Sequence, residues 1–338
     1  MSISRIKFEN FTTFKELEIQ SSPGINIFIG ENGTGKTHIL KAAYAACDIS
    51  KSGETFARKL KSVFMPSGNQ LGRLVSRQVG TQSANIEITR SSQTLQFSFS
   101  TRTETENATK INGLEKWMAN RVESVYIPVK EMLANAPGFR SLYNSREVHF
   151  EEIYADILDR AYIPPKKGAA TVDRRNLMSI LEQVLEGKVE IHGEEFFHKS
   201  KRQNASLEFS LLAEGMRKLG LLWILIQNGS LLNGSILFWD EPEANLNPKI
   251  MKTVVELLLE LQRAGVQVFI ATHDYVTLKT FDLQTEKSDQ VLYHALYRDE
   301  KTREIQIQSS DSYLQLDPNC ILDTFGELYD QDIARALQ

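Results

Sequence analysis

The first hundred residues contain two pairs of short stretches in which apolar and polar residues alternate. In the first pair, residues 3–8 and 17–20 are separated by a short connection. In the second pair, residues 86–90 and 95–100 flank the polar segment 91–94. Alternation with a period of two is typical of strands that bury one face, and short polar connections join such strands into hairpins. The pattern therefore predicts two β-hairpins.

Between these hairpins, an unbroken apolar run at residues 25–29 leads through a glycine-rich segment into residues 38–47, where apolar residues recur with a helical period. A short apolar run bounded by turn residues is typical of a strand that is buried on both faces. Residues 122–127 form another such run, which Pro128 ends. We expect a buried strand, a loop and a helix in direct succession, and a second buried strand later in the chain.

The middle of the chain has a mainly helical period. Its predicted elements are helices at 150–162 and 176–185, a break at the Pro-Pro-Lys-Lys-Gly segment 164–168, and strands at 188–192 and 206–211. Apart from its strands, this part reads as a helical lobe, residues 131–204, that is inserted into the surrounding fold.

The last third of the chain alternates between helical and strand-like stretches. In order, these are a helix at 216–228, a strand at 235–239, a helix at 249–264 and a strand at 266–271. Such alternation is typical of a parallel sheet with crossover helices. A hairpin (291–297 with 304–308) and short helical pieces are expected in a C-terminal extension, residues 281–338. The whole pattern predicts an α/β chain with a mixed central sheet and an antiparallel N-terminal β-subdomain.

The composition narrows the class of protein. Of the 338 residues 41% are hydrophobic, which allows a large core, and the formal net charge of −4 argues against a protein that coats nucleic acid. Cys47 and Cys320 lie far apart without a CxxC spacing, which argues against a disulfide framework or a structural zinc site. No apolar run approaches the length of about 18 residues that a membrane span needs, and the N-terminus lacks the apolar run of a signal peptide. We expect a cytoplasmic protein.

The glycine-rich segment after the first buried strand has the pattern GxxxxGK[ST]. Glycines let backbone N–H groups turn towards phosphate oxygens, and the N-terminus of the following helix adds a partial positive charge. Lys36 is expected to reach the β- and γ-phosphates of a nucleotide, and the Thr37 hydroxyl to coordinate Mg²⁺. The residues expected to contact the nucleotide are Gly30, Glu31, Asn32, Gly33, Thr34, Gly35, Lys36 and Thr37.

A later apolar strand, residues 236–239, ends in two carboxylates, Asp240 and Glu241. Ligands of open α/β sheets bind at the carboxyl ends of the strands. Asp240 is therefore predicted to hold Mg²⁺ beside Thr37, directly or through water, and Glu241 to act as the general base that polarises the attacking water. Alone, an apolar run followed by Asp-Glu would be an ordinary solvated strand end. Its position after the glycine-rich loop favours the catalytic interpretation.

Three further segments add to the candidate site. Residues 244–248, Ala-Asn-Leu-Asn-Pro, follow the two acids, and His273 ends the next predicted strand. A histidine at a strand end is often structural, but one helix and one strand after Glu241 it can sense the γ-phosphate or orient water. Upstream, residues 212–217, Leu-Ala-Glu-Gly-Met-Arg, open an apolar helix. A glycine loop that opens a helix is a second anion site, separate from Lys36.

In their order and spacing these segments resemble the head of ABC-type ATPases. The correspondence is Walker A at 30–37, the signature loop at 212–216, Walker B at 236–241, the D-loop at 244–248 and the switch histidine at His273. The first hairpin and the Leu-x-Glu-Gly-x-Arg form of the signature are similar to the SMC/RecF-like and OLD-like ATPases of DNA maintenance and phage defence. The resemblance implies one P-loop NTPase of ABC head type over residues 1–338.

The resemblance also implies ATP and Mg²⁺ as cofactors and a homodimer with two composite sites. ATP on the Walker A loop of one copy would be completed by the signature loop of the other, and hydrolysis would open the dimer. The roles carried over are catalysis by Lys36, Glu241 and His273, metal binding by Thr37 and Asp240, and nucleotide contact by Ala213, Glu214, Gly215 and Asn245.

Three features depart from the family pattern. The serine of the signature is replaced by Ala213, the expected Q-loop glutamine is missing from residues 128–131, and no aromatic residue clearly stacks on adenine. The candidates that could replace the missing groups are Ser210 or Arg217 for the serine, Lys130 or Glu131 for the glutamine, and Phe14 or Lys15 for the adenine contact.

The favoured function is an ATPase that couples its nucleotide state to a separate effector, a nuclease or toxin, in DNA maintenance or anti-phage defence. The chain lacks coiled-coil heptads, and the segment after His273 is too short for an appended nuclease. A nucleotide-binding subunit of a membrane transporter and an ATP-gated DNA clamp are the alternatives. Direct DNA contact stays open, because short basic clusters occur at 58–61, 166–167, 174–175 and 199–202.

Overall fold

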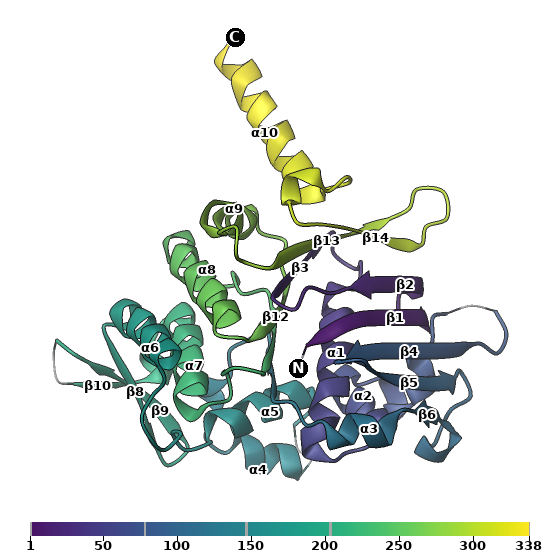
Figure 1. The fold of residues 1–338 in the computed structure, drawn as a ribbon, viewed down its shortest axis with the longest axis horizontal. Helices are drawn as coiled ribbons and strands as arrows, with labels where there is room; N and C mark the ends of the chain where they lie inside the picture. The colour runs from purple at the N-terminus through teal and green to yellow at the C-terminus, as the bar shows by residue number, and fades with distance from the viewer. Residues whose placement is uncertain (1, 78, 146–147, 203–204, 338) are drawn as a thin grey trace.

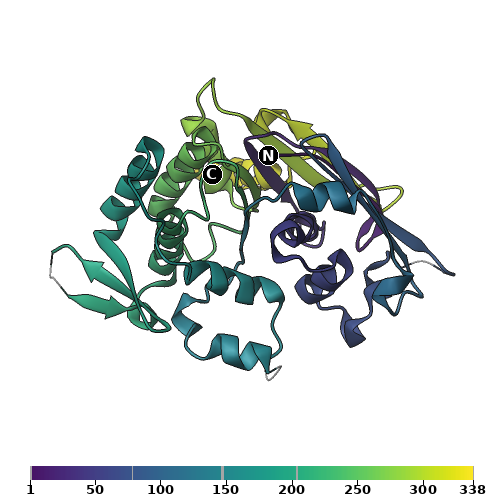
Figure 2. The same ribbon diagram turned by 60° about the horizontal axis from the view of Figure 1, so that its bottom comes forward.

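The computed structural model describes residues 2–77, 79–145, 148–202 and 205–337. In these residues the strands form three sheets (Figure 1). A central sheet carries the nucleotide motifs, and the N-terminal antiparallel sheet and the mainly helical lobe lie to either side of it in both views (Figures 1 and 2). The predicted α/β class, with a mixed central sheet and an antiparallel N-terminal subdomain, is confirmed.

The central sheet has the strand order β14-β13-β3-β12-β11-β7. Its strands are β3 (Ile25–Gly30), β7 (Ser124–Ile127), β11 (Ile236–Asp240), β12 (Gln267–Ala271), β13 (Val291–Arg298) and β14 (Ile305–Ser310). All neighbours are parallel except β13 and β14. Because β12 lies between β3 and β11, the carboxyl ends of the three motif-bearing strands meet at one edge. The hairpin expected in a C-terminal extension is built into this sheet, since β13 pairs with β3.

Alternate residues of the central strands enter two hydrophobic cores. Phe238 faces the core that the sheet shares with α1 (Lys36–Ser52) and the N-terminal sheet. Its neighbour Trp239 faces the opposite core, which is formed with α7 (Glu214–Asn228) and α8 (Pro248–Arg263). A strand covered on both faces must be apolar at every position, which explains the unbroken apolar runs in the sequence.

The N-terminal sheet is antiparallel, with the order β2-β1-β4-β5-β6. Its elements are β1 (Ile3–Phe11), β2 (Phe14–Gln20), β4 (Ser83–Arg90), β5 (Gln93–Ser100) and β6 (Lys110–Asn112), followed by α3 (Leu114–Ala119). The second hairpin turns over Ser91 and Ser92 alone, both with positive φ, rather than over the four residues 91–94. A two-residue turn of this kind matches the twist of the strands, so β5 begins at Gln93.

The lobe contains helices and a small antiparallel sheet. Its elements are α4 (Phe139–Asn144), α5 (Glu152–Ala161), α6 (Val172–Leu185), β8 (Gly187–His192), β9 (Glu195–Ser200) and β10 (Ser206–Glu208). The two predicted helices are confirmed, and α6 begins four residues earlier than expected. The strand expected at 206–211 ends at Glu208, because Phe209–Leu211 forms a turn of 3₁₀ helix before the signature loop. The strand β9 was not predicted.

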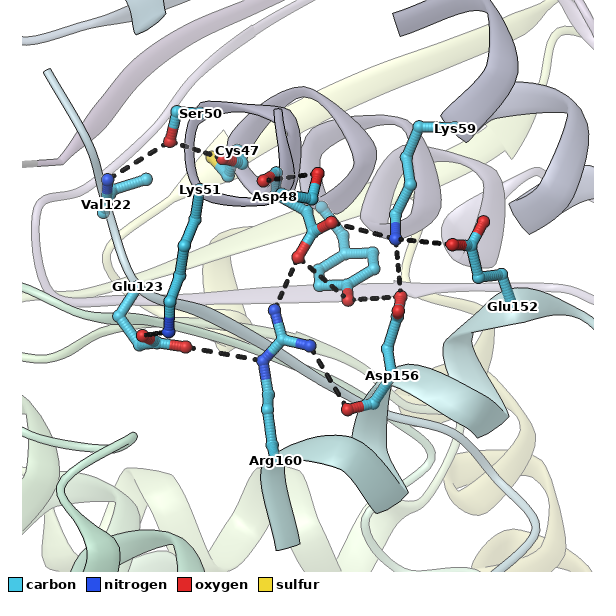
Figure 3. A network of polar contacts seen from close by, with 12 residues as sticks. Cys47, Asp48, Ser50, Lys51, Lys59, Val122, Glu123, Glu152, Asp156 and Arg160 are labelled. Carbon is cyan, nitrogen blue, oxygen red and sulfur yellow. Dashed lines mark hydrogen bonds and ion pairs between the residues drawn. The ribbon is translucent and has the colours of Figure 1, made fainter. Parts of the chain in front are cut away.

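A helix that the sequence pattern did not predict, α2 (Phe56–Phe64), carries a fully buried lysine. The Lys59 Nζ lies 2.9 Å from Asp48 Oδ2 of α1 and 2.8 Å from Asp156 Oδ2 of α5 (Figure 3). The Arg160 guanidinium of α5 reaches the other oxygen of Asp48 at 2.5 Å. Within the basic cluster 58–61, Arg58 is exposed, whereas Lys59 is buried and paired inside the protein. The Lys59 ammonium links α2 to α1 and α5.

Two helices lie in the last part of the chain, before and after the hairpin of β13 and β14. Helix α9 (Tyr275–Gln284) follows the switch segment, residues 272–274, and α10 (Cys320–Ala336) projects from the body (Figure 1). With 17 residues, α10 is longer than the short helical pieces expected here. It is joined to α9 by a stack of the Phe325 ring on the Tyr275 ring, with centroids 4.4 Å apart. In the described part of the chain, no helix combines the length and apolar character that crossing a bilayer requires.

Candidate functional site

The Walker A loop leaves β3 at Gly30 and enters α1 at Lys36. Gly33 and Gly35 have φ values of 80° and 93°, in the left-handed region that side chains disfavour. A Cβ on Gly35 would also lie only 2.4 Å from the Phe14 ring, so both conformation and space require glycine there. Such turns let successive backbone N–H groups face into the loop, where they can bind phosphate.

The remaining loop residues form the rim. Glu31 and Asn32 are exposed, while Thr34 is buried and donates a hydrogen bond from its Oγ1 to the Glu31 carbonyl at 2.8 Å. Beside the loop, a groove of about 740 Å³ is lined by Gly30, by the β13–β14 hairpin and by the first turns of α10, including Cys320. The loop is thus stabilised by the hydrogen bond of Thr34, and one side of it borders the groove.

The Lys36 ammonium lies inside the loop. It donates hydrogen bonds to the carbonyl oxygens of Gly30, at 2.6 Å, and Glu31, at 3.0 Å. Burial lowers the pKa of Lys36, since the charge is removed from water and its two hydrogen-bond partners are neutral. A phosphate in the loop would supply the negative charge that these carbonyls do not.

The aromatic candidate for stacking on adenine is not free to do so. Phe14 is fully buried, and its ring stacks on that of Phe8 with centroids 5.4 Å apart. The prediction that Phe14 stacks on adenine is wrong, because Phe14 belongs to the core of the N-terminal sheet and its ring packs against Gly35. Lys15 is exposed and pairs with Glu304 at 2.6 Å, so its role towards a base stays a prediction.

Asp240 lies at the end of β11, directly opposite the start of α1. Its Oδ1 accepts a hydrogen bond from the Thr37 hydroxyl at 3.2 Å, and its Oδ2 accepts one from the Tyr126 hydroxyl at 3.1 Å. Burial raises the pKa of Asp240 above its ordinary value. A buried carboxylate beside a hydroxyl is an oxygen donor set that suits Mg²⁺, and a divalent cation would favour the charged form. Tyr126 was not predicted, because an apolar strand context gave no sign of its role.

Glu241 and His273 come from adjacent strands and face each other. The Glu241 Oε1 is 3.5 Å from the His273 Nδ1. Glu241 has a φ of 49°, and its backbone N–H donates to the Ala271 carbonyl of β12 at 2.9 Å, so the bend after β11 is fixed to the strand that carries the histidine. Both side chains keep access to solvent, with 32% and 51% of their surfaces exposed. A carboxylate beside a reachable imidazole can accept a proton from water and orient it.

A third carboxylate, Glu243, was missed by the sequence prediction. Its Oε1 accepts hydrogen bonds from the Thr272 hydroxyl at 2.7 Å and from the His273 backbone N–H at 3.2 Å. The only sequence signal was a second acid two positions after Glu241, which is common in loops. The contacts depend on the pairing of β11 with β12 and cannot be read from spacing.

The signature loop and the D-loop form one packed unit. Ala213 caps α7, and the Glu214 Oε2 accepts a hydrogen bond from the Asn245 side-chain amide at 2.9 Å. A Cβ on Gly215 would lie 2.7 Å from the Leu246 Cδ2, so glycine permits this close approach. One turn later, the Lys218 Nζ donates to the Ala244 carbonyl at 2.6 Å. Their roles towards a nucleotide stay predictions.

The residues proposed to replace missing family groups are engaged with each other. The Glu131 Oε2 pairs with the Arg217 Nε at 2.6 Å, and burial raises the pKa of Glu131. Arg217 also donates to the Leu212 carbonyl at 3.0 Å. Lys130, in contrast, is exposed. The segment after β7 is thereby linked to the signature helix, whichever residue serves in place of the glutamine.

Comparison with known sequences identifies relatives in one group of proteins. The chain is 47% identical over 55 residues to the DNA replication and repair protein RecF of Clostridium kluyveri, covering 16% of this chain and 15% of that protein. It is 25% identical over 189 residues to RecF of Lactobacillus acidophilus, covering 56% of this chain and 46% of that protein. The chain thus spans less than half the length of these relatives.

Solved structures share the fold. The SMC head bound to the C-winged helix domain of ScpA superposes with a TM-score of 0.57 at 13% identity, covering 92% of this chain and 98% of that one. An SMC head with an extended coiled coil, bound to the C-terminal domain of ScpA derived from Pyrococcus furiosus, gives a TM-score of 0.57 at 11% identity, covering 98% and 99%. At these identities the likeness concerns the fold.

A family model covers most of the chain. The family described as "AAA domain, putative AbiEii toxin, Type IV TA system" matches residues 25–279, which include the Walker A, signature, Walker B, D-loop and switch segments. The chain therefore belongs to this family, among the ABC-type ATPases of the SMC/RecF-like group.

Proposed function

We propose that this protein binds and hydrolyses ATP as a homodimer and passes its nucleotide state to a separate effector protein. The observation that carries the proposal is the convergence, at one sheet edge, of Lys36, of Asp240 beside Thr37, and of Glu241 beside His273. This set contains a phosphate-binding cation, oxygen ligands for a metal and a carboxylate base, which are the parts that phosphoryl transfer to water needs.

Each residue of this edge has one role in the proposed reaction. Lys36 leaves its two loop carbonyls and binds the β- and γ-phosphates. Thr37 and Asp240 would hold Mg²⁺, which would neutralise charge on the phosphates. Glu241 accepts a proton from water as the water oxygen attacks the γ-phosphorus and the bond to the β–γ bridging oxygen breaks. His273 orients the water or the leaving phosphate, and ADP and inorganic phosphate are released.

The signature unit supports the dimer. Glu214 and Gly215 contact Asn245 of their own D-loop, directly after Ala213. The N-terminus of the 15-residue helix α7 begins there and offers partial positive charge to a γ-phosphate. In the proposed dimer this helix end faces the Walker A loop of the other copy, so that two ATP molecules lie between two copies.

The test uses Glu241→Gln, which keeps the shape of the side chain and removes the base. The steady-state rate of ATP hydrolysis should fall by roughly 10²–10⁴ because the proton acceptor is lost. ATP should still bind, and the variant should accumulate as an ATP-bound dimer, measured by light scattering after gel filtration. A variant that hydrolyses ATP at the parental rate would remove Glu241 from its role. A monomer at saturating ATP would rule out the composite site.

The effector and its setting are the less direct part of the proposal. The likeness to RecF, a toxin in the family description and two SMC heads bound to ScpA domains together support an ATPase that acts on a partner in DNA repair or anti-phage defence, as in the OLD-like subgroup. We place it in the cytoplasm, where such a partner, a nuclease or toxin, would be available.

Direct DNA contact receives less support from the surface charges. Of the basic cluster 199–202, Lys199 pairs with Glu190, Lys201 with Glu182 and Arg202 with Glu186, at 2.8–2.9 Å. Charges that are already paired offer little net attraction to phosphates. Steady-state hydrolysis measured with and without duplex DNA separates the effector-coupled ATPase from the ATP-gated DNA clamp, in which hydrolysis is incidental. Binding to DNA phosphates should fall steeply with salt.

A further inference from the structure

Glu243 lies in the sharp bend that follows β11. The bend is closed by hydrogen bonds from the Ala244 N–H to the Glu241 carbonyl, at 3.1 Å, and from the Leu246 N–H to the Glu243 carbonyl, at 2.9 Å. It turns the Glu243 side chain under the end of the neighbouring strand β12, where only 12% of its surface stays exposed. An acid this well covered must find partners inside the protein, because its loss of hydration is costly.

These partners all belong to the switch segment. The Oε1 atom accepts from the Thr272 hydroxyl at 2.7 Å and from the His273 N–H at 3.2 Å. The Thr272 oxygen in turn accepts from the Asp274 N–H at 3.1 Å, and Asp274 caps α9 by accepting from the Thr277 N–H at 2.7 Å. One carboxylate oxygen thus fixes the backbone on which the switch histidine is mounted.

The other oxygen of the carboxylate has a different environment. Oε2 is buried and has no hydrogen-bond partner among the described residues. The nearest basic group of the switch segment, the His273 Nδ1, is 4.0 Å from Oε1 and 3.5 Å from the Glu241 Oε1. Burial raises the pKa of Glu243. The contacts that Glu243 makes therefore need an acceptor oxygen at Oε1 but no negative charge at Oε2.

We propose that Glu243 is a positioning residue, which clamps Thr272 and His273 so that the imidazole faces Glu241. This inference rests on the proposed hydrolysis of ATP and adds to it a residue that does not touch nucleotide. Glu243 joins the bend after Walker B to the switch segment, so Glu241 and His273 move as one unit. A displacement of about 1 Å in a reacting group can reduce a rate by roughly 10²-fold, so a clamp of this kind affects turnover more than binding.

The test compares Glu243→Ala with Glu243→Gln. Alanine removes the acceptor at Oε1, and we expect kcat to fall by roughly 10- to 100-fold while the KM for ATP stays within about twofold. Glutamine keeps a carbonyl oxygen for Thr272 and His273, and kcat should stay within about threefold of the parental value. Glu260→Ala is the matched control, because Glu260 pairs with Arg263 on α8, away from this edge; it should leave both constants unchanged.

A second measurement needs no hydrolysis. Amide hydrogen exchange of peptides that cover residues 272–277, in the protein without nucleotide, should become at least about tenfold faster in Glu243→Ala and stay near the parental rate in Glu243→Gln. Thr272→Val removes only the hydroxyl donor, so it should give an intermediate change. Exchange in β3 reports whether the fold itself is intact.

Several outcomes would overturn the inference. Parental kcat in Glu243→Ala, or a tenfold rise in KM at constant kcat, would remove the positioning role. Equal losses in the alanine and glutamine variants would assign the role to the charge instead of the acceptor. If the parental protein does not hydrolyse ATP, the proposed function fails and the catalytic part of this inference with it. The exchange experiment would then still decide whether Glu243 holds the segment.

Discussion

Two lysines, Lys36 and Lys59, are both buried, but they differ in the charge of the groups around them. Lys36 donates its hydrogen bonds to neutral groups, the carbonyls of Gly30 and Glu31, and burial lowers its pKa although the more distant carboxylates of the sheet edge oppose this shift. Burial alone would lower the pKa of Lys59 as well, but the carboxylates of Asp156, Asp48 and Glu152 outweigh it, so that this pKa is raised. Lys36 has no carboxylate as a hydrogen-bond partner among the described residues, whereas Lys59 is paired with three carboxylates.

On the proposed function, the charge of Lys36 is available for a ligand, whereas the charge of Lys59 stabilises the fold. A buried cation without a carboxylate partner costs free energy, and a ligand with negative charge recovers that cost when it binds. A buried cation among three carboxylates already has its partners, and removing Lys59 deprives Asp156 and Glu152 of their paired cation and leaves Asp48 with Arg160 alone. The two regions therefore predict opposite results for the same kind of substitution.

The largest effect is expected for Lys59→Met. The change leaves Asp48 and Asp156 without their shared cation in a buried site, and breaking such a cluster costs about 3–5 kcal/mol. The free energy of unfolding, measured by urea denaturation at neutral pH, should fall by that amount. A loss below about 1 kcal/mol would show that water or Arg160 replaces the lysine, and the contrast with Lys36 would fail.

Lys36→Ala, in contrast, should reduce ATP binding and leave stability nearly unchanged. Stability should change by less than about 1 kcal/mol because, among the described residues, no carboxylate forms an ion pair with the lysine, while ATP affinity should fall roughly 100-fold or more with the loss of a charged partner for phosphate. Equilibrium binding of a fluorescent ATP analogue measures the affinity, and urea denaturation measures the stability. Unchanged affinity would contradict the phosphate-binding role of the loop.

A smaller, pH-dependent effect on stability is expected for two aspartates, Asp48 in the ion-pair network of Lys59 and Asp240 at the candidate site. Burial favours a raised pKa for Asp48, but Lys59 and Arg160 outweigh it and hold that pKa below 3.8; burial raises the pKa of Asp240 above 3.8. Asp48 thus contributes stability above pH 3.8 that is lost as the pH falls through its lower folded value, whereas the charge of Asp240 costs stability at neutral pH.

Denaturation of Asp48→Asn and Asp240→Asn at several pH values measures these contributions. Asp48→Asn should lose about 2 kcal/mol at neutral pH, and its difference from the parental protein should shrink as the pH falls below 3.8. Asp240→Asn should be as stable as the parental protein or more stable at neutral pH, and that difference should close on acidification. Equal losses in both variants would mean that Asp240 also belongs to the fold.

The sequence allowed prediction of those parts of the site that depend on neighbours in the chain. The Walker A loop and the acids after β11 could be placed because a strand, a turn and a helix follow each other within a few residues. Glu243 and Tyr126 could not, because their partners, Thr272 and Asp240, come from strands that only the folded sheet brings alongside.

The errors in the fold have the same origin. The burial of Lys59 within the basic cluster 58–61 could not be read from the sequence, because the acids that pair with it lie on α1 and α5, far away along the chain. Phe14 looked free for a base because its packing against Phe8 crosses a hairpin. The strand β9 (Glu195–Ser200) has no clear alternation, since it pairs in a small sheet with weakly buried faces. In each case tertiary contacts decide what the local pattern leaves open.

The position of Cys320 gives this chain a natural attachment point for a reporter. Cys320 is partly exposed at the groove beside Gly30 and Glu31, whereas Cys47 is buried. Burial raises the pKa of both thiols, that of Cys47 to about 11. A maleimide dye at moderately alkaline pH should therefore modify one side chain of the folded protein, without any engineered cysteine. The emission of that dye would report the binding of a triphosphate at the neighbouring Walker A loop.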